Sequence, residues 1–195
     1  MRRWRHFRKA QDGLAAIEFA FLLPVMLVLF FGVVEVSLAL LCRADVSIMA
    51  STAADLIGQV STTQTSDLSN VYGAAGTVMY PYYNPGTTGS QAPTIRITSI
   101  AYNSTTGSTT SGKIAWTCTQ SGSGSLSPTT RSVGNTVTLP QAIMPANGSI
   151  IMAEVAYNYV SPTTQVITGP MNMTNVWYTK PRRVLQIPAP TGGCP

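Results

Sequence analysis

A long apolar stretch near the N-terminus is the strongest constraint on what this chain can fold into. Residues 14–42 read LAAIEFAFLLPVMLVLFFGVVEVSLALLC, and only two charges, Glu18 and Glu35, interrupt them. A helix needs about 20 mostly apolar residues to cross the hydrocarbon core of a bilayer. A helix buried in a soluble core would show a polar face, and this stretch has almost none. The sequence therefore predicts a membrane-spanning helix over 14–42.

Basic residues are concentrated before this stretch. Five of the 12 Lys and Arg residues fall in the first nine positions, and the whole chain has 7 Asp and Glu. The positive-inside rule places such a flank in the cytoplasm. We therefore expect residues 1–13 to form a basic cytoplasmic leader and the chain after the span to lie outside. Because the excess charge belongs to a short tail, it does not predict a nucleic-acid-binding face.

Two other N-terminal signals fit this stretch less well. A secretory signal peptide has an apolar region of about 7–15 residues and a small-residue cleavage site, but this region is longer and residues 37–39 make a poor site. A lipoprotein signal ending at Cys42 would need a small residue where Leu41 stands. We interpret Cys42 instead as an apolar residue near the outer membrane interface.

The helical pattern continues beyond the span. Apolar residues recur there at steps of three or four, at Val46, Met49, Ala53, Leu56 and Val60. This period is typical of an amphipathic helix, so we expect a helical extension over 43–60 that ends near Gly58. An unbroken helix over 14–60 would be about 70 Å long, with a bend at Pro24.

From about residue 61 the chain becomes rich in Thr, Ser and Tyr and poor in charge. Polar and apolar residues alternate in four segments, 94–98, 114–118, 153–159 and 171–178. A period of two with β-branched and aromatic residues predicts antiparallel strands, with the Gly- and Ser-rich segments between them as loops. The predicted fold class is α+β, with a long N-terminal hydrophobic helix and a small antiparallel sheet within 61–195.

The side chains of common enzyme chemistry are missing from the part expected outside. The one histidine is His6, which excludes ordinary Ser-His-Asp, Cys-His and HExxH sites there. Beyond the helix the acids are Asp67 and Glu154, and nothing in the sequence pairs them as a two-carboxylate site. We expect no catalysis, no metal and no cofactor.

The junction between leader and helix carries the functional information. Residues 9–19 read KAQDGLAAIEF, so a basic leader ends at Gly13, an apolar helix begins at Leu14, and Glu18 and Phe19 follow. A carboxylate at the centre of a membrane helix costs about 2.5–3.5 kcal/mol, and less near an interface. Glu18 therefore either reaches interfacial water or has a partner that offsets this cost.

This junction resembles the leader junction of type IV pilins, most closely that of TadE-like pseudopilins of Tad (Flp) pilus systems. Similar features continue through Pro24, Gly32 and Glu35 and return in 154–159 and 178–183. The resemblance implies a pilin-like fold in the bacterial inner membrane, with a periplasmic C-terminal domain. It also implies cleavage by a prepilin peptidase after Gly13, and a role in assembling an adhesive pilus with other pilins and the inner-membrane assembly platform.

The resemblance also implies roles for the two acids of the helix. Cleavage would expose an α-amine on Leu14, and Glu18, next to Phe19, would pair with that amine on a neighbouring subunit. Glu35 lies about 25 Å further along the helix and about 100° around it, so we expect it at the outer membrane interface or against another pilus component. The alternative to a pseudopilin is an uncleaved single-pass protein whose exterior domain binds a ligand or surface.

Two cysteines lie in the part expected outside, where disulfides form. We expect Cys118 and Cys194 to pair, with free thiols or exchange with Cys42 as the alternatives. In the chain-entropy model, a loop of this length contributes about 4 kcal/mol of stability.

Overall fold

The structure is a computed structural model that describes residues 13–84, 91–140 and 142–195, apart from the side chain of Leu14. The predicted leader therefore lies outside the described residues, except for Gly13. In chain order the elements are α2 (Leu14–Gly58), α3 (Thr65–Thr77), β1 (Thr94–Tyr102), β2 (Ser111–Gln120), β3 (Thr136–Thr138), β4 (Ser149–Tyr159) and β5 (Met171–Thr179). The predicted α+β class is confirmed, with one long apolar helix followed by one antiparallel sheet.

The chain divides into two compact units. The N-terminal unit contains the chain up to Ala39 together with Val160–Gly169, the connection between β4 and β5. The sheet unit contains Leu40–Tyr159 and Pro170–Pro195. Helix α2 therefore contributes its apolar first half to one unit and its second half to the other.

The first half of α2 presents apolar side chains outward. Its exposed residues include Phe19, Phe21, Val28, Leu29 and Phe30. Pro24 is inside the helix. By length and composition, residues Ala15–Gly58 form a helix able to cross a membrane, as the sequence predicts.

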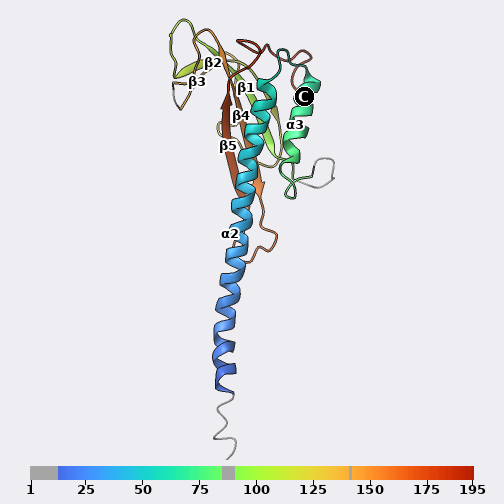
Figure 1. The fold of residues 1–195 in the computed structure, drawn as a ribbon, viewed down its shortest axis with the longest axis vertical. Helices are drawn as coiled ribbons and strands as arrows, with labels where there is room; N and C mark the ends of the chain where they lie inside the picture. Colours follow the sequence, from blue (N-terminus) through green and yellow to red (C-terminus); the bar gives the residue numbers. More distant parts are fainter. Residues whose placement is uncertain (1–12, 85–90, 141) are drawn as a thin grey trace, which may run out of the picture. The chain divides into compact units, whose positions relative to one another are not determined.

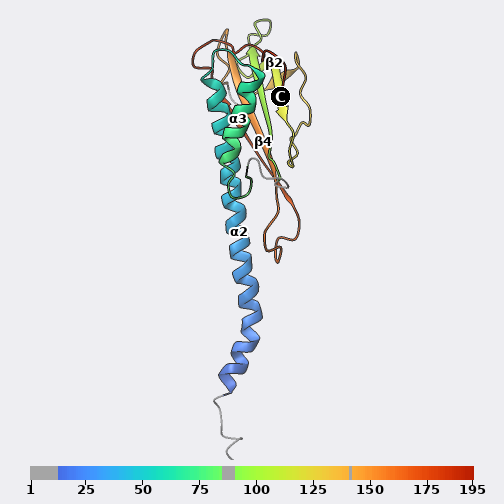
Figure 2. The same cartoon turned by 90° about the vertical axis from the view of Figure 1, so that its right-hand side faces the viewer.

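The sheet unit is built on five antiparallel strands in the order β3-β2-β1-β4-β5 (Figure 1). The second half of α2 and helix α3 lie side by side on one face of this sheet, as the two perpendicular views show (Figures 1 and 2). The buried side of α2 is made of small and medium apolar residues: Cys42, Val46, Met49, Ala50, Ala53, Ala54 and Ile57. These residues form the apolar core on the helix side of the sheet unit.

A second apolar cluster forms from residues of four sheet strands and of the long loops. It contains Ile100, Ile114, Val137, Leu139, Met144, Ile150 and Met152. Both faces of the inner strand β4 are therefore covered, and ten of its eleven residues are buried. Burying each large apolar side chain stabilises the fold by about 1.5–3 kcal/mol, so these clusters hold the sheet unit together.

Helix α3 is the main difference from the predicted elements. The sequence pattern predicts no helix after residue 60, yet 13 residues here are helical. Their apolar positions Leu68, Val71, Tyr72 and Ala75 are buried, and the Asp67 carboxylate accepts a hydrogen bond from the N–H of Gln64 at 3.0 Å. This bond satisfies a donor at the N-terminus of the helix. Helix α2 ends at Gly58, near which the sequence predicts the end of the helical extension.

Candidate functional site

The predicted cleavage junction lies at the first turn of α2. Gly13 is exposed, and its carbonyl oxygen accepts a hydrogen bond from the N–H of Ile17 at 3.2 Å. Apart from its chain neighbours and the backbone of its own helix, no atom of the described residues lies within 4 Å of the position that a β-carbon on Gly13 would occupy. The peptide bond between Gly13 and Leu14 therefore lies at an open helix terminus.

Glu18 and Phe19 follow on the exposed surface of the helix. The Phe19 side chain is 58% exposed, and apolar residues surround Glu18 in the sequence on both sides. Within the described ranges, no hydrogen bond or ion pair to Glu18 is seen. If lipid or protein covers this surface, a charged carboxylate there needs a partner to offset its desolvation.

Glu35 is bound by its own chain. Its carboxylate accepts a hydrogen bond from the Thr163 hydroxyl and bonds from the backbone N–H groups of Gln165 at 2.7 Å, Val166 at 3.0 Å and Ile167 at 2.6 Å. Thr164, within this turn, has a positive φ of 50°. Successive N–H groups that converge in this way form a backbone site for an anion.

These contacts give the Glu35 carboxylate partners within its own chain. A carboxylate has about four acceptor sites, and four donors of the loop fill them. The sequence missed the loop because backbone N–H groups leave no side-chain signature. The available signal was Glu35 itself, since a buried carboxylate requires hydrogen-bond donors.

The structure joins Cys118 and Cys194 in a disulfide with a Cα–Cα distance of 5.3 Å, and leaves Cys42 free and buried. A second contact ties the same tail to the same strand, because the indole N–H of Trp116 donates to the carbonyl of Ile187 at 2.9 Å. The C-terminal tail is thus fixed to β2 at two points.

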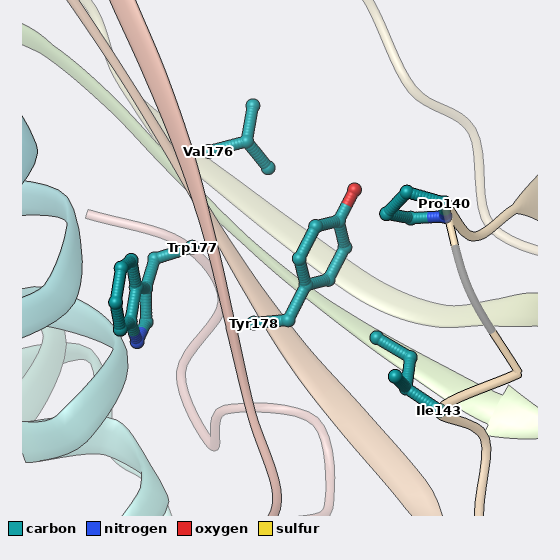
Figure 3. A pocket seen from close by; sticks show the side chains of 5 residues that line it. All are labelled: Pro140, Ile143, Val176, Trp177 and Tyr178. Carbon is teal, nitrogen blue, oxygen red and sulfur yellow. The ribbon is translucent and has the colours of Figure 1, made fainter.

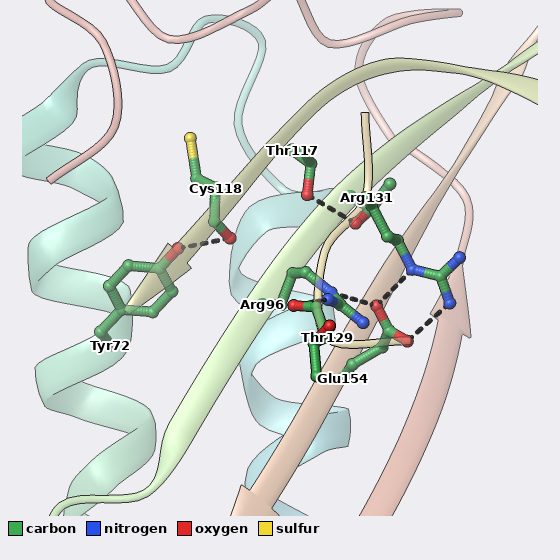
Figure 4. Close-up of polar contacts among 8 residues, drawn as sticks. Tyr72, Arg96, Thr117, Cys118, Thr129, Arg131 and Glu154 are labelled. Carbon is green, nitrogen blue, oxygen red and sulfur yellow. Dashed lines mark hydrogen bonds and ion pairs between the residues drawn. The ribbon is translucent and has the colours of Figure 1, made fainter. Parts of the chain in front are cut away.

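The acid of the sheet, Glu154, is enclosed by two arginines (Figure 4). Its carboxylate accepts hydrogen bonds from Arg96 Nε at 2.6 Å, from Arg131 Nε at 2.8 Å and from Arg131 Nη2 at 2.7 Å. Burial alone would raise the pKa of Glu154, but the hydrogen bonds and charges of Arg131 and Arg96 hold it below its ordinary value. Asp67 lies on α3 with a different partner, so the two acids do not form a two-carboxylate site.

An open pocket beside β5 is the other feature that resembles a binding site (Figure 3). Tyr178 points toward Pro140 and Ile143, whereas Trp177 leaves the opposite side of the strand. The lining is apolar apart from the Tyr178 hydroxyl, and burial raises the pKa of that group. In the part of the chain that the structure describes, no group of three or more His, Cys, Asp or Glu side chains is placed to hold a metal ion.

Comparison with known proteins locates the similarity in the long helix. The family model of TadE-like proteins matches residues 13–55, which begin at Gly13 and cover most of α2. No curated protein and no solved structure matches the chain. Over residues 13–55, the chain is thus similar to TadE-like proteins, as the resemblance at its N-terminus predicts.

Proposed function

We propose that this protein is a pseudopilin or minor pilin that takes part in assembling a Tad (Flp) adhesive pilus. Its leader would lie in the cytoplasm, α2 would cross the inner membrane, and the sheet unit would lie in the periplasm. Its proposed partners are a prepilin peptidase, other pilins and the inner-membrane assembly platform. The role requires binding and packing and no catalysis.

The observation that carries this proposal is the coincidence of three features at one place. The family match begins at residue 13, the helix begins at Leu14, and an exposed acid and aromatic follow at Glu18 and Phe19. Cleavage after Gly13 would leave a charged amine at the start of an apolar helix. Pairing this amine with Glu18 of a neighbour would offset the desolvation of both charges and set the register between subunits.

Gly13→Ala tests the cleavage step without disturbing the folded chain, because the space around Gly13 is open. In cells that carry the pilus system, intact-mass measurement should find the natural protein starting at Leu14. The variant should keep its leader and still insert into the membrane. Gly73→Ala is the matched control, since a β-carbon there also meets no atom within 4 Å, and it should be cleaved normally. A natural chain that keeps residues 1–13 would favour the uncleaved membrane anchor instead.

Glu18→Leu tests the pairing step. The variant should enter the membrane, because it removes a charge from an apolar helix, but it should be depleted from assembled pili. Glu18→Asp keeps the charge and should assemble better than Glu18→Leu. Undiminished pilus assembly by Glu18→Leu would remove the pairing role and leave the membrane insertion intact.

A further inference from the structure

We infer that the loop Val160–Gly169 rests on the outer surface of the membrane that α2 crosses, with Val166 in contact with lipid and Glu35 holding the loop in place. The partner of this loop is the lipid at the boundary between headgroups and acyl chains. The inference rests on the membrane span proposed above, and it assigns a second membrane contact to a segment far from the helix in sequence.

The first support is the attachment of the loop to the apolar half of α2. Val160–Gly169 belongs to the N-terminal unit and not to the sheet unit that its flanking strands form. The four hydrogen bonds to Glu35 fix the loop at one level of the helix. A β-carbon on Gly32 would lie 3.8 Å from Cγ2 of Val166, so Val166 lies beside the helix one turn before Glu35.

The second support is the position of Gly32 and Glu35 along the membrane span. At 1.5 Å per residue, Gly32 lies about 27 Å and Glu35 about 32 Å from the start of the helix at Leu14. The hydrocarbon core of a bilayer is about 30 Å thick. A span that begins at Leu14 and runs along the membrane normal therefore ends near Glu35, earlier than the predicted bound at residue 42, with Gly32 just inside the core. The side chain of Val166 is then at the depth of the outermost acyl carbons.

The third support is the chemistry of the loop. Its sequence is VSPTTQVITG, and no charged residue occurs between Glu154 and Lys180. Val160 is 47% exposed and Val166 is 46% exposed. Valine side chains that are exposed to bulk water do not stabilise a loop. At a membrane interface the same side chains are transferred out of water, which is favourable. The carboxylate of Glu35 is already saturated with donors, so it needs no water from this boundary.

Lipid is favoured over a neighbouring subunit because the loop is continuous with the surface that lipid would cover. The exposed helix residues from Phe19 to Phe30, among them Val28 and Leu29, are uncharged and apolar. The loop extends this apolar surface at its outer end. Hydrogen bonding to Glu35 lets the loop reach this depth without leaving the N–H groups of Gln165, Val166 and Ile167 unpaired in an apolar medium.

The test measures how close labelled sites lie to lipid. The full chain is reconstituted in vesicles of phosphatidylethanolamine and phosphatidylglycerol, some of which carry a doxyl quencher near the glycerol end of the acyl chain. Single cysteines labelled with an environment-sensitive fluorophore replace Val166, Val133 or Val28. Val133 is the matched control, a valine of the sheet unit that is 65% exposed. Unsubstituted protein, in which Cys42 is buried and the other two cysteines are paired, gives the labelling background.

We expect quenching at Val166 to be several times that at Val133, with emission shifted to shorter wavelength. Glu35→Ala should lower quenching at Val166 to the level of Val133 and leave Val28 unchanged. Equal quenching at Val166 and Val133, or quenching at Val166 that persists in Glu35→Ala, overturns the inference. So does a Val166 label that is shielded from aqueous iodide but not quenched by lipid, because protein would then cover the loop. Loss of quenching at Val28 would instead show that the proposed membrane span fails.

Discussion

Among substitutions that change a single side-chain atom, we expect the replacement of Glu154 to lower the free energy of unfolding of the sheet unit most. Glu154→Gln replaces a carboxylate oxygen by an amide nitrogen and keeps the size of the side chain. Glu154 is 2% exposed, Arg96 is 1% exposed and Arg131 is 14% exposed. The carboxylate therefore balances one fully buried and one mostly buried guanidinium group.

The magnitude follows from what the substitution leaves behind. Glutamine offers one acceptor where three hydrogen bonds now end, and its amide N–H groups face further donors. Two arginines then remain buried without a counter-charge. Removing one partner of a buried ion pair costs about 3–5 kcal/mol, and we expect Glu154→Gln to fall in this range. Arg131→Gln leaves the Arg96–Glu154 pair neutral and should cost less, about 1.5–3 kcal/mol, for its hydrogen bonds to a charged acceptor.

The measurement is urea unfolding of the full chain in detergent, followed by near-ultraviolet circular dichroism and analysed by linear extrapolation. Lys113→Gln is the control, because it removes an exposed positive charge from β2 and should change the unfolding free energy by less than about 0.5 kcal/mol. A loss below about 1 kcal/mol for Glu154→Gln, or a smaller loss than for Arg131→Gln, would refute the reasoning from uncompensated buried charge.

Three further predictions concern pH, the disulfide and a surface ion pair. The pKa of Glu154 is lowered in the folded protein, so the ionised carboxylate stabilises the fold at any pH above its unfolded pKa of about 4.3. This stabilisation is lost as the pH falls through the lower folded pKa. Urea midpoints in acid should therefore fall more steeply for the natural chain than for Glu154→Gln. Cys194→Ser opens the bond to Cys118, which spans 76 residues, and should cost about 4 kcal/mol in unreduced protein; an unchanged urea midpoint would contradict this. Arg182 and Asp55 pair at side chains that are 60% and 43% exposed, so Arg182→Gln should cost less than about 1 kcal/mol by the same assay, and a larger loss would indicate a role beyond the pair.

The parts of the fold that local periodicity determines could be predicted. The alternation in 94–98 lies within β1, and the steps of three and four at Val46, Met49 and Ala53 mark buried positions of α2. In α2 the pattern is visible because one face of the helix is buried in the sheet unit, whereas in 94–98 the residues of both strand faces are buried. Strand ends were less accurate, since β1 continues to Tyr102 and pairs there through a register shift.

Helix α3 shows why the remaining elements were missed. Its sequence, TSDLSNVYGAAGT, contains two internal glycines and several Ser and Thr residues, all of which lower helix propensity. Leu68, Val71, Tyr72 and Ala75 nevertheless follow the helical period, and Asp67 stands at a capping position. In this segment, burial against the sheet outweighs propensity, and the period is the signal that could have identified it.

The buried ion cluster could not be found from local patterns. Arg96 and Glu154 are directly opposite in the pairing of β1 with β4, a relation that depends on register between strands 58 residues apart. Arg131 comes from a Ser- and Gly-rich loop that carries no period. Once the register is known, opposite charges on facing residues predict the pair.

The two acids of the apolar stretch 14–42, Glu18 and Glu35, can be told apart only from the structure. In sequence, Glu18 and Glu35 are equivalent interruptions of one apolar stretch, and each poses the same desolvation problem. The chain solves this problem for Glu35 with four donors of its own loop. For Glu18 the described residues supply none. A carboxylate that is saturated internally has no acceptor capacity left for a neighbour, so in the proposed pilus assembly we expect Glu18, and not Glu35, to pair with another subunit. Replacement of Glu35 should therefore alter the chain's own loop, whereas replacement of Glu18 should leave the isolated chain unchanged and act when subunits meet.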